Sequence, residues 1–207
     1  VATGDRSPLS KYDLKKRRYL GPTSMDVEMG LIMCNMIQAR PGGIVWDPFC
    51  GTGSLLINAA HFGALTMGSD IDIRVIKWGK KDKRTGQNVD VWTNFEDYGL
   101  EPPVGLLRMD LHKHSWTSSA HAEGTLQGVV GDPPYGVRAG GRKSGGRKRG
   151  EDGTVKPVPE EHRENHIPST APYPFSECMD DLMDTSARLL AVGGHVLGCV
   201  SREKLVG

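Results

Sequence analysis

Short apolar runs alternate with segments of helical periodicity along most of the chain. The runs at 44–46, 65–69, 105–109, 126–130 and 194–200 are typical of buried strands, because they are short and bounded by polar or turn-forming residues. The segments 23–40, 54–62, 73–87 and 175–190 show the three- and four-residue apolar spacing of helices. Strands that alternate with helices predict an α/β fold, with a mostly parallel sheet covered by helices on both faces.

An aspartate stands at the end of four predicted strands. These aspartates are Asp47, Asp70, Asp110 and Asp132. The carboxyl ends of parallel strands share one edge of a sheet, and ligands of such sheets bind outside that edge. We therefore expect the four carboxylates to line one binding site, although each of them singly is more typical of a cap or a turn.

Two segments interrupt this alternation. Residues 1–10 are polar and are expected to form a linker, and the basic run 11–18 indicates either a solvated surface or contact with a phosphate backbone. Residues 138–150 hold six basic residues and five glycines, which cannot bury apolar surface. We therefore predict one domain over 11–207, with a long, basic and mobile insertion at 138–174.

The composition excludes two broad classes of protein. Hydrophobic residues make up 37% of the 207 positions, unlike a disordered chain, and no run approaches the ~20 apolar residues of a membrane span. The net charge of +1 selects no partner. The four cysteines form no Cys-x-x-Cys pair and the first residues show no signal pattern, so we expect a cytoplasmic protein.

A glycine-rich turn links the first predicted strand to a helix. Its sequence, Asp-Pro-Phe-Cys-Gly-Thr-Gly over 47–53, lacks the third glycine of the dinucleotide fingerprint, because Leu56 occupies that position, and it lacks the lysine of a phosphate loop. A ligand with an amine, a carboxylate and a ribose fits better than a dinucleotide. Asp47 would pair with the amine and the Gly51–Gly53 amides would hold the carboxylate. The alternative is a tight turn without a ligand.

The two following aspartates suggest further contacts with such a ligand. Asp70 lies about 20 residues beyond the turn, where an acid commonly binds both hydroxyls of a ribose. Asp110 would accept from the amino group of an adenine, with Met109 and Leu111 beside the ring.

The sequence Asp132-Pro133-Pro134-Tyr135 is the most specific feature of the chain. Proline has no N–H, so this segment presents mainly acceptors, which suit a planar –NH₂ group. Tyr135 offers a ring on which a flat base would stack. The alternative is a Pro-Pro turn followed by a core tyrosine.

Together these motifs resemble a known enzyme group. The residues 47–53, 70–72, Asp110 and 132–136 are similar to the S-adenosylmethionine-dependent amino methyltransferases, and the stretches 18–26 and 137–143 narrow the resemblance to the catalytic domain of the tRNA guanosine-10 N2-methyltransferases. The resemblance covers about residues 11–200. It implies a Rossmann-like class I methyltransferase fold and methyl transfer from S-adenosylmethionine to the N2 amine of a guanine in tRNA.

The resemblance also implies a role for individual residues. The implied cofactor-binding residues are Thr23, Asp47, Pro48, Phe49, Gly51, Thr52, Gly53, Asp70, Ile71, Asp110 and Leu111. The implied catalytic residues are Asp132, Pro133, Pro134 and Tyr135, and the residues implied to contact RNA are Arg138, Arg142 and Lys143. No metal is expected, because the His112-x-His114 pair has no third ligand placed by sequence.

Members of this family act with partners that the present residues do not supply. The resemblance implies a small zinc-binding activator subunit and an N-terminal THUMP-type RNA-binding region, which these residues do not include. The seven-stranded methyltransferase sheet also needs two strands after the fifth, and 201–207 are too few for both, so we expect the last strands to be missing.

Three alternative functions stay open at this stage. The N6 amine of adenine and the amide of a protein glutamine are also planar –NH₂ groups, so the acceptor segment would suit either. A non-catalytic RNA- or protein-binding module that keeps the fold is the alternative of another class.

Overall fold

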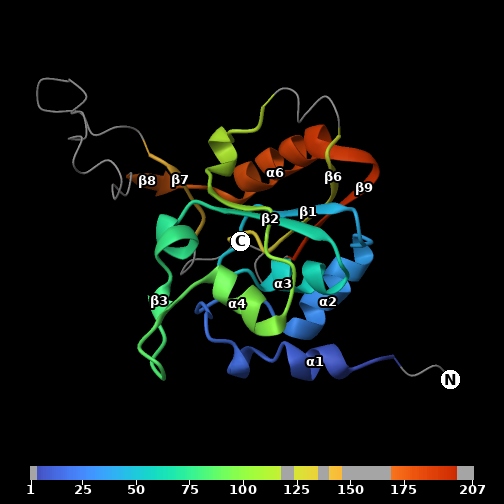
Figure 1. Ribbon diagram of the computed structural model, residues 1–207. Coiled ribbons are helices and arrows are strands. Elements are labelled where there is room, and N and C mark those ends of the chain that lie inside the picture. The colour runs from blue at the N-terminus through green and yellow to red at the C-terminus, as the bar shows by residue number, and fades with distance from the viewer. Residues whose placement is uncertain (1–3, 118–123, 135–139, 146–168, 200–207) are drawn as a thin grey trace, which may run out of the picture.

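A five-stranded parallel sheet forms the centre of the molecule (Figure 1). The structure is a computed structural model that describes residues 4–117, 124–134, 140–145 and 169–199. The strands are β1 (Ile44–Asp47), β2 (Leu65–Asp70), β5 (Gly105–Arg108), β6 (Leu126–Gly131) and β9 (Leu190–Gly198). Their spatial order is β5-β2-β1-β6-β9, and all four neighbouring pairs are parallel. The chain winds one way from β1 and the other way from β6, so the topological switch point lies between these two strands.

Helices cover both faces of the sheet, with α6 on one side and α2, α3 and α4 on the other (Figure 1). The helices are α1 (Ser7–Lys11), α2 (Val27–Met36), α3 (Ser54–His61), α4 (Val91–Tyr98) and α6 (Phe175–Leu189), and short helical turns are η1 (Leu14–Lys16), η2 (Arg74–Trp78) and η3 (Leu111–Lys113). The predicted Rossmann-like class I fold is confirmed.

The central strand β1 shows why both faces must be covered. Val45 packs into the cluster under α2 and α3, while the next residue, Trp46, packs into the cluster under α6. Both side chains are fully buried, and the Trp46 indole Nε1 donates to Ser69 Oγ at 3.1 Å. A strand that is apolar on both faces needs a layer on each side.

The linker predicted over residues 1–10 is wrong from residue 7 onward. Helix α1 begins at Ser7, and Pro8 is buried. The basic run that follows also serves the fold, since Arg17 is only 5% exposed and donates to Ser54 Oγ at 2.6 Å. Arg18 pairs with Asp97 at 2.5 Å.

The helix predicted over 73–87 is also wrong. The chain forms only the turn η2 there and then a hairpin of β3 (Lys80–Lys81) and β4 (Asn88–Val89). Gly79, which lies between η2 and β3, has φ +62°, and a Cβ at this position would lie 2.3 Å from the Val89 carbonyl oxygen. The helix in this region is instead α4, which a capping box of Asp90 and Thr93 starts.

Other boundaries differ by a few residues. Helix α2 begins after Asp26, whose carboxylate caps the Glu28 and Met29 amides, and it ends at Met36 rather than at 40. Strand β9 begins at Leu190, earlier than the predicted 194. The insertion predicted as irregular contains an antiparallel pair, β7 (Arg142–Ser144) and β8 (Thr170–Pro172), closed by a bond from Gly145 N to Ser169 O at 2.8 Å. Residues 146–168 lie outside the described ranges.

Among the helices of the described residues, none is both long and apolar enough to cross a bilayer.

Candidate active site

A cavity of about 390 Å³ opens at the carboxyl edge of the sheet, beside the switch point. Its walls come from the segments that follow β1, β2, β5 and β6 and from the β7–β8 pair. All four strand-end aspartates line it, as the sequence predicts. The lining residues named from the sequence are Thr23, Asp47, Pro48, Phe49, Gly51, Thr52, Asp70, Ile71, Met109, Asp110, Leu111, Asp132, Pro133, Pro134 and Arg142.

Asp47 is the last residue of β1 and is 1% exposed. Its Oδ1 accepts from the Phe49 amide at 2.9 Å. Burial raises the pKa of Asp47 well above its usual range, and the negative charges of Asp70 and Asp132 raise it further. The cavity therefore holds a carboxylate that a cationic ligand would stabilise.

Asp70 joins the end of β2 to the glycine-rich turn. Its Oδ2 accepts from the Gly51 amide at 3.0 Å, and its Oδ1 accepts from the Asp72 amide at 2.9 Å. Burial raises the pKa of Asp70, and these amide bonds oppose the rise. Because the two acceptors are held by backbone, the carboxylate has a fixed orientation.

Two of the three amides in Gly51–Gly53 that are predicted to hold a ligand carboxylate, those of Gly51 and Gly53, are already bonded within the protein. The Gly51 amide donates to Asp70, and the Gly53 amide donates to the Cys50 carbonyl at 2.7 Å. Gly53 is also absent from the cavity lining; a Cβ there would lie 2.8 Å from Val91, and φ is +83°. This glycine serves the turn and the packing of α4.

The segment 21–25 forms hydrogen bonds with the same glycine-rich turn. Thr52 Oγ1 accepts from the Gly21 amide at 3.2 Å and lies 3.3 Å from Ser24 Oγ. These bonds bring Thr23, Ser24 and Met25 to the cavity wall.

Asp110 anchors the wall on the β5 side. Its Oδ1 accepts from the His112 amide at 3.1 Å and caps η3, while its Oδ2 accepts from the Ser144 amide of β7 at 2.7 Å. Asp110 therefore has both predicted roles: it caps a helical turn, and it lines the cavity.

Tyr173 is a wall residue that sequence reasoning missed. It is 5% exposed, its amide donates to the Gly141 carbonyl at 2.9 Å, and its hydroxyl donates to Asp181 Oδ2 at 2.5 Å. Only the tertiary fold brings it to the cavity, since it lies 41 residues after Asp132 in sequence. No local motif signals it.

The acceptor segment follows β6 directly, and Asp132, Pro133 and Pro134 all line the cavity. The two prolines supply no N–H, so carboxylate and carbonyl oxygens dominate this part of the wall. Tyr135, predicted to stack on a base, and Arg138, predicted to contact RNA, lie outside the described residues.

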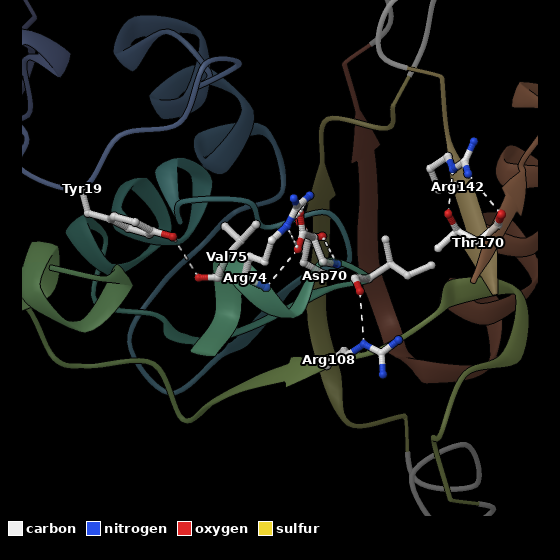
Figure 2. A network of polar contacts seen from close by, with 9 residues as sticks. Tyr19, Asp70, Arg74, Val75, Arg108, Arg142 and Thr170 are labelled. Atoms are coloured by element: carbon white, nitrogen blue, oxygen red, sulfur yellow. Dashed lines mark hydrogen bonds and ion pairs between the residues drawn. The ribbon is translucent and has the colours of Figure 1, made fainter. Parts of the chain in front are cut away.

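The other two residues predicted to contact RNA make bonds within the protein. Arg142 donates from Nε to Thr170 Oγ1 at 2.8 Å and from a terminal nitrogen to the Thr170 carbonyl at 3.1 Å (Figure 2). Lys143 pairs with Glu177. Arg108, labelled beside Asp70 in Figure 2, donates from Nε to the Ile71 carbonyl, and this bond of 3.3 Å holds the backbone next to Asp70.

His112 meets two acidic residues that sequence reasoning missed. Its Nδ1 lies 2.9 Å from Asp181 Oδ2 and 3.4 Å from Glu177 Oε1, a spacing at which three side chains can surround an ion. However, Glu177 already pairs with Lys143, and Asp181 accepts from Tyr173. Hydrogen bonds and ion pairs thus account for these three residues, His112, Glu177 and Asp181.

Cys50 also lines the cavity but is a poor nucleophile. Burial raises the pKa of its thiol well above the usual value, and the Asp47 and Asp70 charges act in the same direction. The thiol therefore stays protonated, which agrees with a filling role.

Comparisons with known proteins point to one enzyme class. Residues 15–147 match the family described as UPF0020: RMKL-like, methyltransferase domain. The tRNA (guanine(10)-N(2))-methyltransferase of Dictyostelium discoideum is 39% identical over 95% of this chain and 36% of its own length, and that of Saccharomyces cerevisiae is 37% identical over 95% of this chain and 44% of its own length. The chain thus spans about two fifths of the length of these relatives. Among solved structures, a SAM-dependent methyltransferase from Agrobacterium tumefaciens aligns with a TM-score of 0.49 and 17% identity, over 85% of this chain and 45% of its own.

Proposed function

The chain belongs to the UPF0020 family of RMKL-like methyltransferase domains, and on that premise we propose that it methylates the exocyclic N2 amine of a guanine in tRNA. The donor is S-adenosylmethionine, as the resemblance of the motifs implies, and the target is guanosine 10, as in the names of the similar tRNA methyltransferases. The observation that carries the proposal is the convergence of Asp47, Asp70, Asp110 and the Asp132-Pro133-Pro134 segment on one cavity.

The cavity residues fit the charge of this donor. Four carboxylates line the cavity, and Arg142 is the one Lys or Arg side chain among the described lining residues. S-adenosylmethionine supplies an electrophilic methyl group on a cationic sulfonium when bound. Burial, and then repulsion from Asp70 and Asp132, raise the pKa of Asp47 in the free protein, and a cation beside Asp47 would offset both effects.

Each carboxylate would bind a different part of the donor. Asp47 would hold the ammonium group and Asp70 the ribose hydroxyls, since its oxygens are already oriented by backbone amides. Asp110 would accept from the adenine amine, with Leu111 against the ring. The remaining residues that we propose to contact the donor are Thr23, Pro48, Phe49, Gly51, Thr52 and Ile71.

The acceptor segment would orient the guanine. Asp132 and the Pro133 carbonyl would accept the two N–H groups of the amine and turn its lone pair toward the methyl group. Tyr135 would stack on the base after it leaves its own stack. No side chain forms a covalent bond in this scheme, so the rate enhancement comes from positioning and electrostatics.

We also propose the tRNA contacts and partners that the resemblance implies. Arg138, Arg142 and Lys143 would lie near the RNA, and a THUMP-type region elsewhere in the full-length protein would add affinity. A small zinc-binding activator would cover apolar surface. The outer strand β5 is a candidate for that contact, because it lies at the sheet edge and Val104 and Leu107 are 59% and 47% exposed.

Mass spectrometry of tRNA nucleosides tests the proposal. The chain is incubated with tRNA and S-adenosylmethionine, with and without the activator, and N2-methylguanosine is expected as the product. Asp132→Ala should remove the product, whereas Asp180→Asn, an exposed change on α6, should not. Methylated adenine in the tRNA, or no methylated nucleoside in any arm, would contradict the assignment.

A further inference from the structure

The hairpin of β3 and β4 carries a local concentration of positive charge. Residues 77–84 contain five cations and one carboxylate, Asp82, in a chain whose net charge is only +1. All five cationic residues are exposed: Lys77, Lys80, Lys81, Lys83 and Arg84.

The charge of this hairpin is not neutralised within the protein. In the described part of the chain, none of the four cations of the hairpin, nor Lys77 at the end of η2, forms an ion pair with a carboxylate. Asp82 is 7% exposed and accepts from the Arg84 amide at 2.9 Å and from Thr85 Oγ1 at 3.3 Å. Its carboxylate therefore shapes the turn, and Lys77, Lys81, Lys83 and Arg84 remain exposed.

The fold holds these cations on a preformed scaffold. Lys80 pairs with Val89 and Lys81 with Asn88 across the ladder, and the Asp82 amide donates to the Gln87 carbonyl at 2.8 Å. Lys80 also donates to the Leu20 carbonyl at 2.6 Å, which fastens the hairpin to the body. A preformed surface loses less entropy on binding than a mobile tail does.

The hairpin projects from the edge of the sheet where the cavity opens. Ile71 lines the cavity, and η2 leads from there into β3. Figure 1 shows β3 on the same side of the molecule as β7 and β8, and Arg142 of β7 lines the cavity. A polyanion that enters the cavity with one base would meet this positive charge next to the opening.

We propose that the β3–β4 hairpin binds the phosphate backbone of the tRNA whose guanine enters the cavity. This inference rests on the proposed function, and it adds a second RNA contact to the one proposed for Arg138, Arg142 and Lys143. Phosphate contacts set register and affinity without reading sequence. The hairpin would therefore support binding of many tRNAs rather than select among them.

Fluorescence anisotropy with labelled tRNA, at several salt concentrations, tests this surface. The variant Lys81→Ala/Lys83→Ala/Arg84→Ala should weaken binding by on the order of tenfold or more at physiological salt, and should lower the slope of log K against log salt by ~2–3. The control is Arg40→Ala/Arg188→Ala, which removes two exposed cations near the amino ends of β1 and β9, away from the hairpin. The control should leave affinity and slope close to those of the unchanged chain.

Further measurements separate the outcomes. Lys81→Arg/Lys83→Arg keeps the charge and should keep the slope, and circular dichroism checks that each variant folds. The proposal is overturned if the triple variant keeps the original affinity and slope, or if the unchanged chain has no salt-dependent affinity for tRNA. Binding through the hairpin without any methylated guanine at saturating tRNA would contradict the proposed function instead.

Discussion

Replacing Asp47 with asparagine tests most directly whether a negative charge in the cavity binds a cationic donor. The amide side chain would keep the shape of the carboxylate and an oxygen that accepts from the Phe49 amide, so the substitution removes mainly the negative charge. In the free protein that charge is costly, because Asp47 is 1% exposed and faces the charges of Asp70 and Asp132. In the complex the same charge would pair with the ammonium group of the donor.

The two states should therefore respond in opposite directions. Loss of a charge-assisted hydrogen bond costs ~1.5–3 kcal/mol, so the affinity for S-adenosylmethionine should fall by about 10- to 150-fold. The free protein should gain about 1–3 kcal/mol, since a buried and incompletely paired group has become neutral. Each kcal/mol corresponds to a rise of ~2–4 °C in Tm for a chain of this length.

The gain in stability should depend on pH with a defined sign. Burial raises the pKa of Asp47 in the folded state, so between the unfolded carboxyl pKa of about 3.9 and the raised folded value the folded protein binds more protons than the unfolded one. The wild-type chain then loses stability as pH rises through this window, and the Asp47→Asn chain does not. The difference in Tm should grow across the window and stay constant above it.

Calorimetry and thermal melts measure both effects on the same samples. Titration with S-adenosylmethionine in buffers of different ionisation enthalpy should also show proton release by the wild-type chain at a pH near the raised pKa of Asp47, and less release by the variant. Asp180→Asn, an exposed carboxylate on α6, is the control and should change neither quantity. A variant that binds the donor as tightly as the wild type, or whose Tm falls at every pH, would refute this reasoning.

Three further substitutions test separate parts of the structure. Asp132→Ala should abolish methyl transfer while donor affinity in calorimetry changes little; unchanged turnover would contradict its role. Gly79→Ala should lower stability by ~1–3 kcal/mol in urea unfolding, because φ is +62° and the new Cβ would lie 2.3 Å from the Val89 carbonyl oxygen. Ser54→Ala should lower the free energy of unfolding by ~1–3 kcal/mol, since it removes an acceptor of the buried Arg17. An unchanged midpoint of urea unfolding would mean that the guanidinium finds another partner.

The sheet and its edge were predictable because their signals are local. Buried strands read as short apolar runs, and an aspartate at the end of each parallel strand must come to the same edge whatever the details of packing. Asp47, Asp70, Asp110 and Asp132 therefore meet as the sequence predicts.

The errors lie where distant contacts decide the structure. Val75 and Ile76 fit the apolar spacing of a longer helix. The chain nevertheless turns at Gly79, where φ is positive and the Val89 carbonyl, ten residues later in the sequence, leaves no room for a side chain. Arg17 sits in a run of basic residues that looks solvated, and only the fold places Ser54 and the Tyr12 carbonyl around its guanidinium. Tyr173 likewise reaches the cavity through β8 and α6, and nothing near it in the sequence indicates that position.

The β7–β8 pair makes the geometry of the cavity wall independent of the number of residues that connect its two strands. Its two strands are joined at their far end by the bond between the Gly145 amide and the Ser169 carbonyl, and at their near end Tyr173 bonds to Gly141 beside the cavity. These two hydrogen bonds do not depend on the number of residues between 145 and 169, and they position the part of the cavity wall that contains Arg142 and Tyr173. A reporter module inserted at that point should therefore leave the geometry of the cavity unchanged.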